Sequence, residues 1–427
     1  MSHAGDEQGK APADTSARRK YARRLTRGAC LLAAAVILSP WLIETEWPLY
    51  VAALSPWVAM CSALALRALP FAACLGLAVG LMAVLRRRWF CRWVCPTGLC
   101  ADAASRVGRT LRLRGRQLPP VGLAIALITL AGAGLGYPLL LFLDPLAMLS
   151  GACTVMVAPA AAWWSGLGVA AVLLLSLLMP GSWCARFCPL GATQELLCAK
   201  RGRESFSPST RELLRGQSTR TTPDLVSRTP WRLARRVVLG GLVGAAWAAL
   251  AKRTRADVPP TLRPPGARGT GSERRSGPEF VGLCIRCGNC VRACPAKIIE
   301  PDRSSPGIAG LLAPIIRFAH DYCREDCTRC TAVCPSGALR PLALPEKRQT
   351  PIGLPRVDMD VCLLGDDHDC AVCRSFCPFE AIKLVFSEAE YTLTPQIDAA
   401  RCPGCGACQV ACPTQPRKAI VVYPLGE

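Results

Sequence analysis

Four blocks of closely spaced cysteines in the last third of the chain restrict its fold more than any other feature. Each block has four cysteines and ends in Cys-Pro, and the first and fourth blocks read Cys-x2-Cys-x2-Cys-x3-Cys-Pro. Three thiolates at this spacing fit three corners of a [4Fe–4S] cube, and the fourth usually reaches a partner cluster. The predicted iron ligands are Cys284, Cys287, Cys290, Cys294, Cys323, Cys327, Cys330, Cys334, Cys362, Cys370, Cys373, Cys377, Cys402, Cys405, Cys408 and Cys412.

The second and third blocks keep the last three positions but lengthen the first gap to three and seven residues. A longer loop still lets the first cysteine approach the cube, so we expect four [4Fe–4S] clusters in all. Zinc sites prefer two separated pairs, and disulfide scaffolds are short secreted chains, so neither suits repeated triplets. The spacing leaves open whether the first block exchanges its fourth cysteine with the fourth block and the second with the third, or adjacent blocks do so.

The first half of the 427-residue chain is rich in Ala, Leu, Val and Gly, with basic clusters beside its apolar runs. Runs at 29–43, 68–85, 121–143 and 166–180 reach, with their flanks, the ~20 residues of a bilayer span. The stretch 50–66 contains Pro56 and is not counted. The positive-inside rule places the basic segments in the cytoplasm. We therefore predict a multi-pass protein of the bacterial inner membrane, in contact with lipid.

Residues 231–253 combine Arg235 and Arg236 with a modest apolar run, which is typical of a twin-arginine export signal or of a fifth membrane helix. Both interpretations place the remainder of the chain on the periplasmic side. The predicted divisions are a disordered basic N-terminus (1–28), a membrane domain (29–200), a basic cytoplasmic linker (201–233), a signal or anchor (234–251), a Pro/Gly/Arg linker (252–280) and a polyferredoxin domain (281–427).

The membrane half has a pair of motifs of its own, Cys91-x3-Cys95-Pro and Cys184-x3-Cys188-Pro, each following an apolar run. The same signature at equivalent places indicates an internal repeat. The four thiols could hold a fifth cluster, act as a dithiol switch or pack as ordinary side chains.

These motifs resemble two known families. Residues from about 20 to 200 resemble the NapH-type membrane polyferredoxins, also seen in NosR- and CcoG-type proteins, through both Cys-x3-Cys-Pro motifs, Trp183-Cys-Ala-Arg-Phe-Cys-Pro-Leu-Gly-Ala192 and Asp144-Pro145. Residues from about 230 to 425 resemble the NapG/MauM-type ferredoxins, through Leu262-Arg-Pro-Pro-Gly-Ala267, Cys284-Ile-Arg-Cys-Gly-Asn-Cys290 and Val333-Cys-Pro-Ser-Gly-Ala-Leu339. The chain therefore resembles a fusion of the two.

The resemblance implies an α-helical membrane domain of four to five spans, followed by an α+β bacterial ferredoxin-like domain. It also implies electron transfer from quinol to a periplasmic reductase or another redox partner, such as a cytochrome. The alternative is an accessory role in redox sensing or in maturation of a respiratory metalloenzyme. The sequence has no nucleotide-binding glycine motif and only three histidines, which favours an electron carrier, or a quinol-oxidising subunit, over a catalyst. The basic clusters flank apolar runs, so we expect no nucleic-acid partner.

Overall fold

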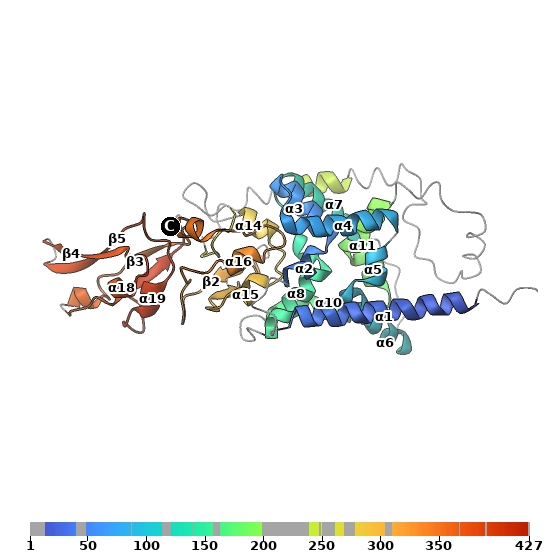
Figure 1. Ribbon diagram of the computed structural model, residues 1–427, viewed down its shortest axis with the longest axis horizontal. Helices are drawn as coiled ribbons and strands as arrows, with labels where there is room; N and C mark the ends of the chain where they lie inside the picture. Colours follow the sequence, from blue (N-terminus) through green and yellow to red (C-terminus); the bar gives the residue numbers. More distant parts are fainter. Residues whose placement is uncertain are drawn as a thin grey trace, which may run out of the picture.

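The computed structural model describes residues 13–39, 48–86, 88–112, 121–138, 140–156, 163–198, 239–246, 249, 261–268, 278–303, 310–366, 368–388 and 391–425. Two parts lie end to end in an elongated molecule (Figure 1). The first, up to residue 198, is helical, and the second, from residue 261, consists of short helices, short strands and turns. We refer to them as the helical part and the ferredoxin part.

Prolines begin many helices of the helical part. Pro56, Pro96 and Pro145 each occupy the first turn, where the missing N–H costs no hydrogen bond. The helices are α1 (Ala13–Ile37), α2 (Pro48–Ala53), α3 (Pro56–Leu66), α4 (Phe71–Leu85), α5 (Trp89–Trp93), α6 (Pro96–Thr110), α7 (Val121–Gly134), α8 (Pro145–Cys153), α10 (Leu167–Leu178) and α11 (Pro189–Cys198), with short turns of helix at Leu141–Leu143, Thr154–Met156, Trp163–Gly166 and Trp183–Phe187.

The prediction of an α-helical membrane domain, and with it that of a multi-pass inner-membrane protein, is wrong. Within the described ranges, none of the helices combines the length and the apolar character that a bilayer crossing requires. Helices α4, α7 and α10 have 15, 14 and 12 residues, short of the ~20 that a span needs. Helix α1 has 25 residues, but its sequence includes six basic residues. The prediction of contact with lipid was based on these spans and loses that basis.

Two further predictions concern the ends of the helical part. The N-terminal 28 residues were expected to be disordered, but α1 is already helical from Ala13. The predicted cytoplasmic linker 201–233 and the paired Arg235 and Arg236 lie outside the described residues.

The ferredoxin part has three separate two-stranded antiparallel sheets. Strand β1 (Ile299–Pro301) pairs with β2 (Pro314–Ile316), β3 (Leu354–Val357) with β6 (Ile420–Tyr423), and β4 (Ile382–Ser387) with β5 (Thr392–Ile397). The short helices are α14 (Pro278–Leu283), α15 (Asn289–Ala293), α16 (Arg329–Ala332), α17 (Leu344–Arg348), α18 (Val372–Ser375) and α19 (Ala407–Ala411), with a turn of helix, η6, at Leu363–Asp366. The expected ferredoxin-like part is therefore present.

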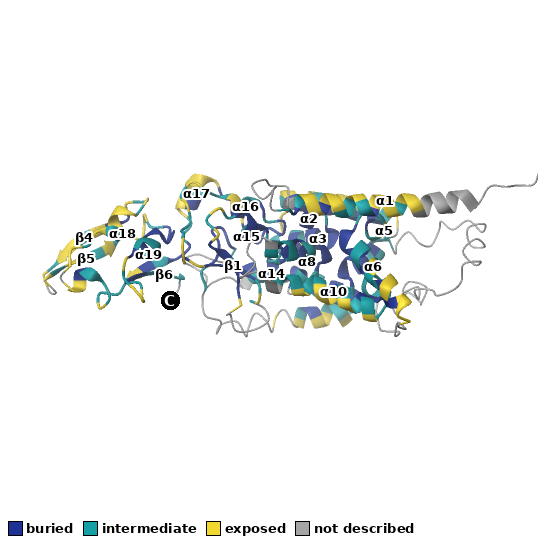
Figure 2. Ribbon diagram, turned by 90° about the horizontal axis from the view of Figure 1, so that it is seen from below, coloured by how far each residue is buried: buried dark blue, intermediate teal, exposed yellow. Residues whose placement is uncertain are grey.

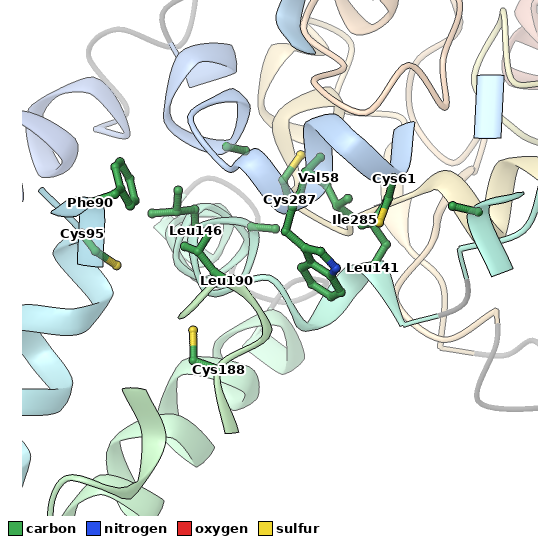
Figure 3. Close-up of a cluster of buried hydrophobic side chains, with 14 residues drawn as sticks. Val58, Cys61, Phe90, Cys95, Leu141, Leu146, Cys188, Leu190, Ile285 and Cys287 are labelled. Carbon is green, nitrogen blue, oxygen red and sulfur yellow. The ribbon is translucent and has the colours of Figure 1, made fainter. Parts of the chain in front are cut away.

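The two parts share a buried junction. Figure 3 shows Ile285 and Cys287 of the ferredoxin part in one apolar cluster with Val58 and Leu141 of the helical part. Figure 2 shows buried residues running through the middle of the molecule on both sides of this junction. The first cysteine block is therefore packed directly against the helices.

Asp144 is a buried carboxyl group in the helical part. Its Oδ1 accepts a 2.6 Å hydrogen bond from Ser55 Oγ, and its Oδ2 accepts bonds from the N–H groups of Leu146 and Ala147 at the start of α8. Burial raises the pKa of Asp144 to about 6, and these hydrogen bonds act in the opposite direction.

This raised pKa predicts a pH dependence of stability. The folded chain binds the proton of Asp144 more tightly than the unfolded chain does. The resulting contribution to the free energy of unfolding is complete below about pH 4 and is lost as the pH rises through about 6. Between those limits the stability should fall by roughly 3 kcal/mol. Asp144→Asn should flatten this dependence, measured by urea unfolding followed by circular dichroism. A variant at an exposed carboxyl, Asp326→Asn, should keep it, and an unchanged slope in Asp144→Asn would contradict the assignment.

Candidate metal centres

The first cysteine block forms a cavity with one cysteine of the second block. Cys284, Cys287 and Cys290 line a cavity of about 500 Å³ together with Cys334. Gly288 has a φ of 70°, and a Cβ there would lie 2.0 Å from Thr154 Oγ1 of the helical part. Only glycine suits this close approach, which explains the residue in the motif. We call this quartet site I.

The second block forms the matching cavity. Cys323, Cys327 and Cys330 line a space of about 360 Å³ with Cys294, the last cysteine of the first block. Lys347 is nearly buried here and donates hydrogen bonds to the backbone carbonyls of Arg324 and Cys327. These bonds hold the loop that supplies the first two cysteines. We call this quartet site II.

The third and fourth blocks repeat the arrangement. Cys362, Cys370 and Cys373 line a cavity of about 380 Å³ with Cys412, the last cysteine of the fourth block, and we call this site III. In the fourth block, burial raises the pKa of Cys408, and the nearby thiols of Cys405, Cys402 and Cys377 raise it further. Site IV therefore consists of Cys377, Cys402, Cys405 and Cys408.

The fourth cysteines are thus exchanged between adjacent blocks, first with second and third with fourth. The strands explain why. Pairing of β1 with β2 returns the chain after the first block toward the second, and α15 packs against α16. Likewise α18 of the third block packs against α19 of the fourth. Of the two pairings that the spacing leaves open, the geometry matches the adjacent one.

The two Cys-x3-Cys-Pro motifs also come together, in the helical part. Burial raises the pKa of Cys91 well above its usual range, and the nearby thiols of Cys188, Cys95 and Cys184 raise it further. Cys95 precedes α6, and Cys188 precedes α11. Each accepts a hydrogen bond on its sulfur from the N–H three residues on, at Gly98 and Gly191. Gln194 Nε2 also donates to Cys91 Sγ at 3.3 Å. We call these four cysteines the helical quartet.

The chemistry of these quartets suits an iron–sulfur cluster. Burial, and then the neighbouring thiols, raise the pKa values of Cys290, Cys330 and Cys91, so a bound cation would favour their thiolate forms. Within the described ranges, no group of three or more His, Cys, Asp or Glu side chains is arranged to hold a metal ion. The cysteines of sites I, II and III instead surround cavities, which a multinuclear cluster with four thiolate ligands would fill.

Comparison with protein families agrees with this arrangement. The chain matches a 4Fe-4S dicluster domain at residues 283–338 and a 4Fe-4S binding domain at 394–420. A further 4Fe-4S binding domain matches at 68–114 and 161–204, the two segments that supply the helical quartet. The fold and the quartets therefore define a protein of the [4Fe–4S] ferredoxin class, with an electron-transfer role.

Curated relatives identify the family. The methylamine utilization ferredoxin-type protein MauM of Methylobacillus flagellatus is 33% identical over 210 residues, which are 46% of this chain and 84% of the relative. The ferredoxin-type protein NapG of Escherichia coli is 32% identical over 174 residues, 38% of this chain and 71% of the relative. The chain belongs to the NapG/MauM family of ferredoxin-type proteins. No solved structure matches it significantly.

Three arginines around site I were not expected from the sequence. Arg263, Arg286 and Arg292 are largely buried, and each lies near cysteines of this site. Arg286 also lies over the ring of Phe142, with 4.0 Å from its guanidinium carbon to the ring centre. In the sequence, only their positions between cysteines distinguish Arg286 and Arg292 from surface basic residues.

Proposed function

We propose that the chain carries electrons along a row of five [4Fe–4S] sites, in the order helical quartet, I, II, IV, III. When bound, each cluster accepts and releases one electron. The chain's own residues set the order of the sites and keep water away from their thiolates. The observation that carries the proposal is that every neighbouring pair of quartets in this row is joined by contacts.

The first step of the row crosses the junction. Cys95 and Cys188 of the helical quartet and Cys287 of site I belong to one buried apolar cluster. Figure 3 shows Leu146 and Leu190 between the two groups of cysteines. Apolar side chains therefore fill the space between these two sites, and an electron would cross packed protein rather than water.

The remaining steps run through the ferredoxin part. Sites I and II share two blocks, and Cys290 lies close enough to Cys330 for their charges to interact. Site II joins site IV through a 2.9 Å hydrogen bond that the N–H of Cys323 donates to the carbonyl of Cys405. Sites IV and III share blocks, and Cys408, Cys412 and Cys373 lie in one apolar cluster.

Iron and sulfide analysis of anaerobically purified protein tests the number of clusters. We expect about twenty irons per chain, since each cube has four. Replacing Cys91 and Cys184 by alanine should lower the count to about sixteen. The matched control replaces two cysteines outside all the quartets, Cys74 and Cys198, by alanine and should leave about twenty. A count of about sixteen in the unchanged chain would contradict a cluster at the helical quartet.

The alternative role as a thiol sensor has less support. A reactive thiol is partly exposed and has a lowered pKa. Burial instead raises the pKa of Cys184 to about 11 and that of Cys95 to about 12. These thiols therefore suit ligation better than exchange with a disulfide.

The proposal also includes an electron donor, a quinol, and an electron acceptor, a redox protein. The two Cys-x3-Cys-Pro motifs support the likeness of residues 20–200 to NapH-type proteins. That likeness in turn supports a quinol as the electron donor. Relatives named as ferredoxin-type proteins of methylamine utilization support a redox protein as partner. Anaerobic addition of duroquinol should bleach the visible absorbance of the protein, and no bleaching would contradict a quinol donor.

A further inference from the structure

The β4–β5 hairpin forms the end of the molecule farthest from α1 (Figure 1). Its base is buried, because Ile382 and Ile397 pair there and pack against the cysteines of the third and fourth blocks. Its outer half exposes Val385, Phe386 and Leu393. Within the described ranges, no third strand extends this sheet. Two-stranded hairpins are only marginally stable in water, so this exposed outer half needs an explanation.

One more aromatic side chain extends the apolar surface. Tyr391 is 83% exposed and lies edge-on to Phe386, with ring centres 5.7 Å apart. Phe386 is the cross-strand partner of Leu393, so these two side chains and Tyr391 form a contiguous apolar surface. Contiguous apolar surface of this kind marks interaction sites on soluble domains. We call Phe386, Tyr391 and Leu393 the tip surface.

The tip surface lies beside site III, the last site of the proposed row. Pro395 of β5 lines the site III cavity together with Cys362 and Cys412. Thr392 Oγ1 of the same strand donates a 2.6 Å hydrogen bond to the carbonyl of Leu364 in η6. A partner seated on the hairpin would therefore contact the element that covers site III.

The charge around the tip is opposite to that of the chain. The chain has a formal net charge of +21, yet residues 358–398 contain nine acidic and two basic residues. Among the described residues of this segment, the exposed carboxylates are those of Asp360, Asp366, Asp369, Glu380 and Glu388. Electrostatic complementarity steers redox partners together and selects between them. These five carboxylates, which we call the acidic rim, favour a partner with a basic surface.

We propose that the tip surface and its acidic rim are the docking site for a basic redox protein that exchanges electrons through site III. This proposal rests on the proposed electron-transfer function. The redox protein would present lysines around an exposed edge of its prosthetic group. The expected interface is small and the complex short-lived, as in other electron-transfer encounters.

Binding of a lysine-rich c-type cytochrome to the full chain, measured by titration calorimetry at low ionic strength, tests the proposal. The tip variant carries Asp360→Asn, Glu380→Gln and Glu388→Gln. It should bind about tenfold more weakly at low salt, and the difference should vanish in ~0.5 M salt because exposed charges are then screened. A control variant with Glu279→Gln, Glu300→Gln and Glu346→Gln removes the same charge outside the cysteine blocks and should bind like the unchanged chain.

A second variant tests the apolar centre without altering charge. Phe386→Ser with Tyr391→Ser should weaken binding at every salt concentration, and iron content should stay unchanged in all variants. Equal binding by the tip and control variants would overturn the proposal. So would tighter binding of a cytochrome with acetylated lysines, or loss of self-association in the tip variant without loss of cytochrome binding.

Reduction of an artificial acceptor separates this proposal from the electron-transfer function. The protein is first reduced with dithionite and freed of excess reductant by anaerobic gel filtration, after which the tip variant should reduce ferricyanide at the unchanged rate. Failure of the unchanged chain to reduce ferricyanide would contradict the electron-transfer function itself. Slow reduction by the tip variant alone would show damage to site III and would overturn the assignment of these residues to docking.

Discussion

Replacing Cys402, Cys405 and Cys408 by alanine should remove about four irons per chain, and one further replacement should then reveal the partner block. Adding Cys377→Ala should remove no further iron, because Cys377 belongs to site IV, which the triple replacement has already destroyed. Adding Cys412→Ala should remove about four further irons, because this cysteine lines site III with Cys362 and Cys373. Iron and acid-labile sulfide analysis measures both effects.

The two quadruple variants are matched controls for each other, since each lacks four of the same eight cysteines. If every block held its own cluster, the outcomes would be reversed, with Cys377→Ala removing further iron and Cys412→Ala none. An equal loss in both variants would show that sites III and IV do not form independently. The comparison therefore distinguishes exchanged from unexchanged ligands without any spectroscopic assignment.

The ferredoxin part could be predicted from the sequence because its signals are local. The Cys-Pro spacing and the glycines at 288, 404 and 406 determine the loop geometry within a few residues, and all three glycines have positive φ. The pairing of blocks could not be predicted in this way. It depends on β1–β2 pairing and on the packing of α18 against α19, which cysteine spacing does not encode.

The helical part was harder to predict because composition says little about where a helix ends. The run 166–180 contributes α10, which ends at Leu178 just before Pro180 and Gly181. The run 121–143 is divided by the turn at Gly136 and Tyr137, and α7 ends at Gly134. Apolar residues were counted across these breaks, which made the expected spans too long. By contrast, both Cys-x3-Cys-Pro motifs were found, because each is a short local pattern.

Arg292→Met should lower the reduction potential of site I, because it removes a positive charge beside a group that becomes more negative on reduction. The side chain of Arg292 is 3% exposed and lies near Cys287 and Cys290. It donates hydrogen bonds to Ser150 Oγ of the helical part, at 2.7 Å, and to Asn289 Oδ1. Buried charges interact far more strongly than exposed ones. We expect a shift of about 60 mV, which for one electron is a tenfold change in the equilibrium constant.

A redox titration followed by EPR measures this shift, and the site I signal is identified as the one missing from Cys334→Ala. Arg292→Lys keeps the charge and should move the potential much less than Arg292→Met. Arg348→Met removes an exposed charge on α17 and should leave the potential unchanged, since water screens it. If the Lys and Met variants shift the potential equally, the shape of the junction rather than the charge of Arg292 determines the potential of site I.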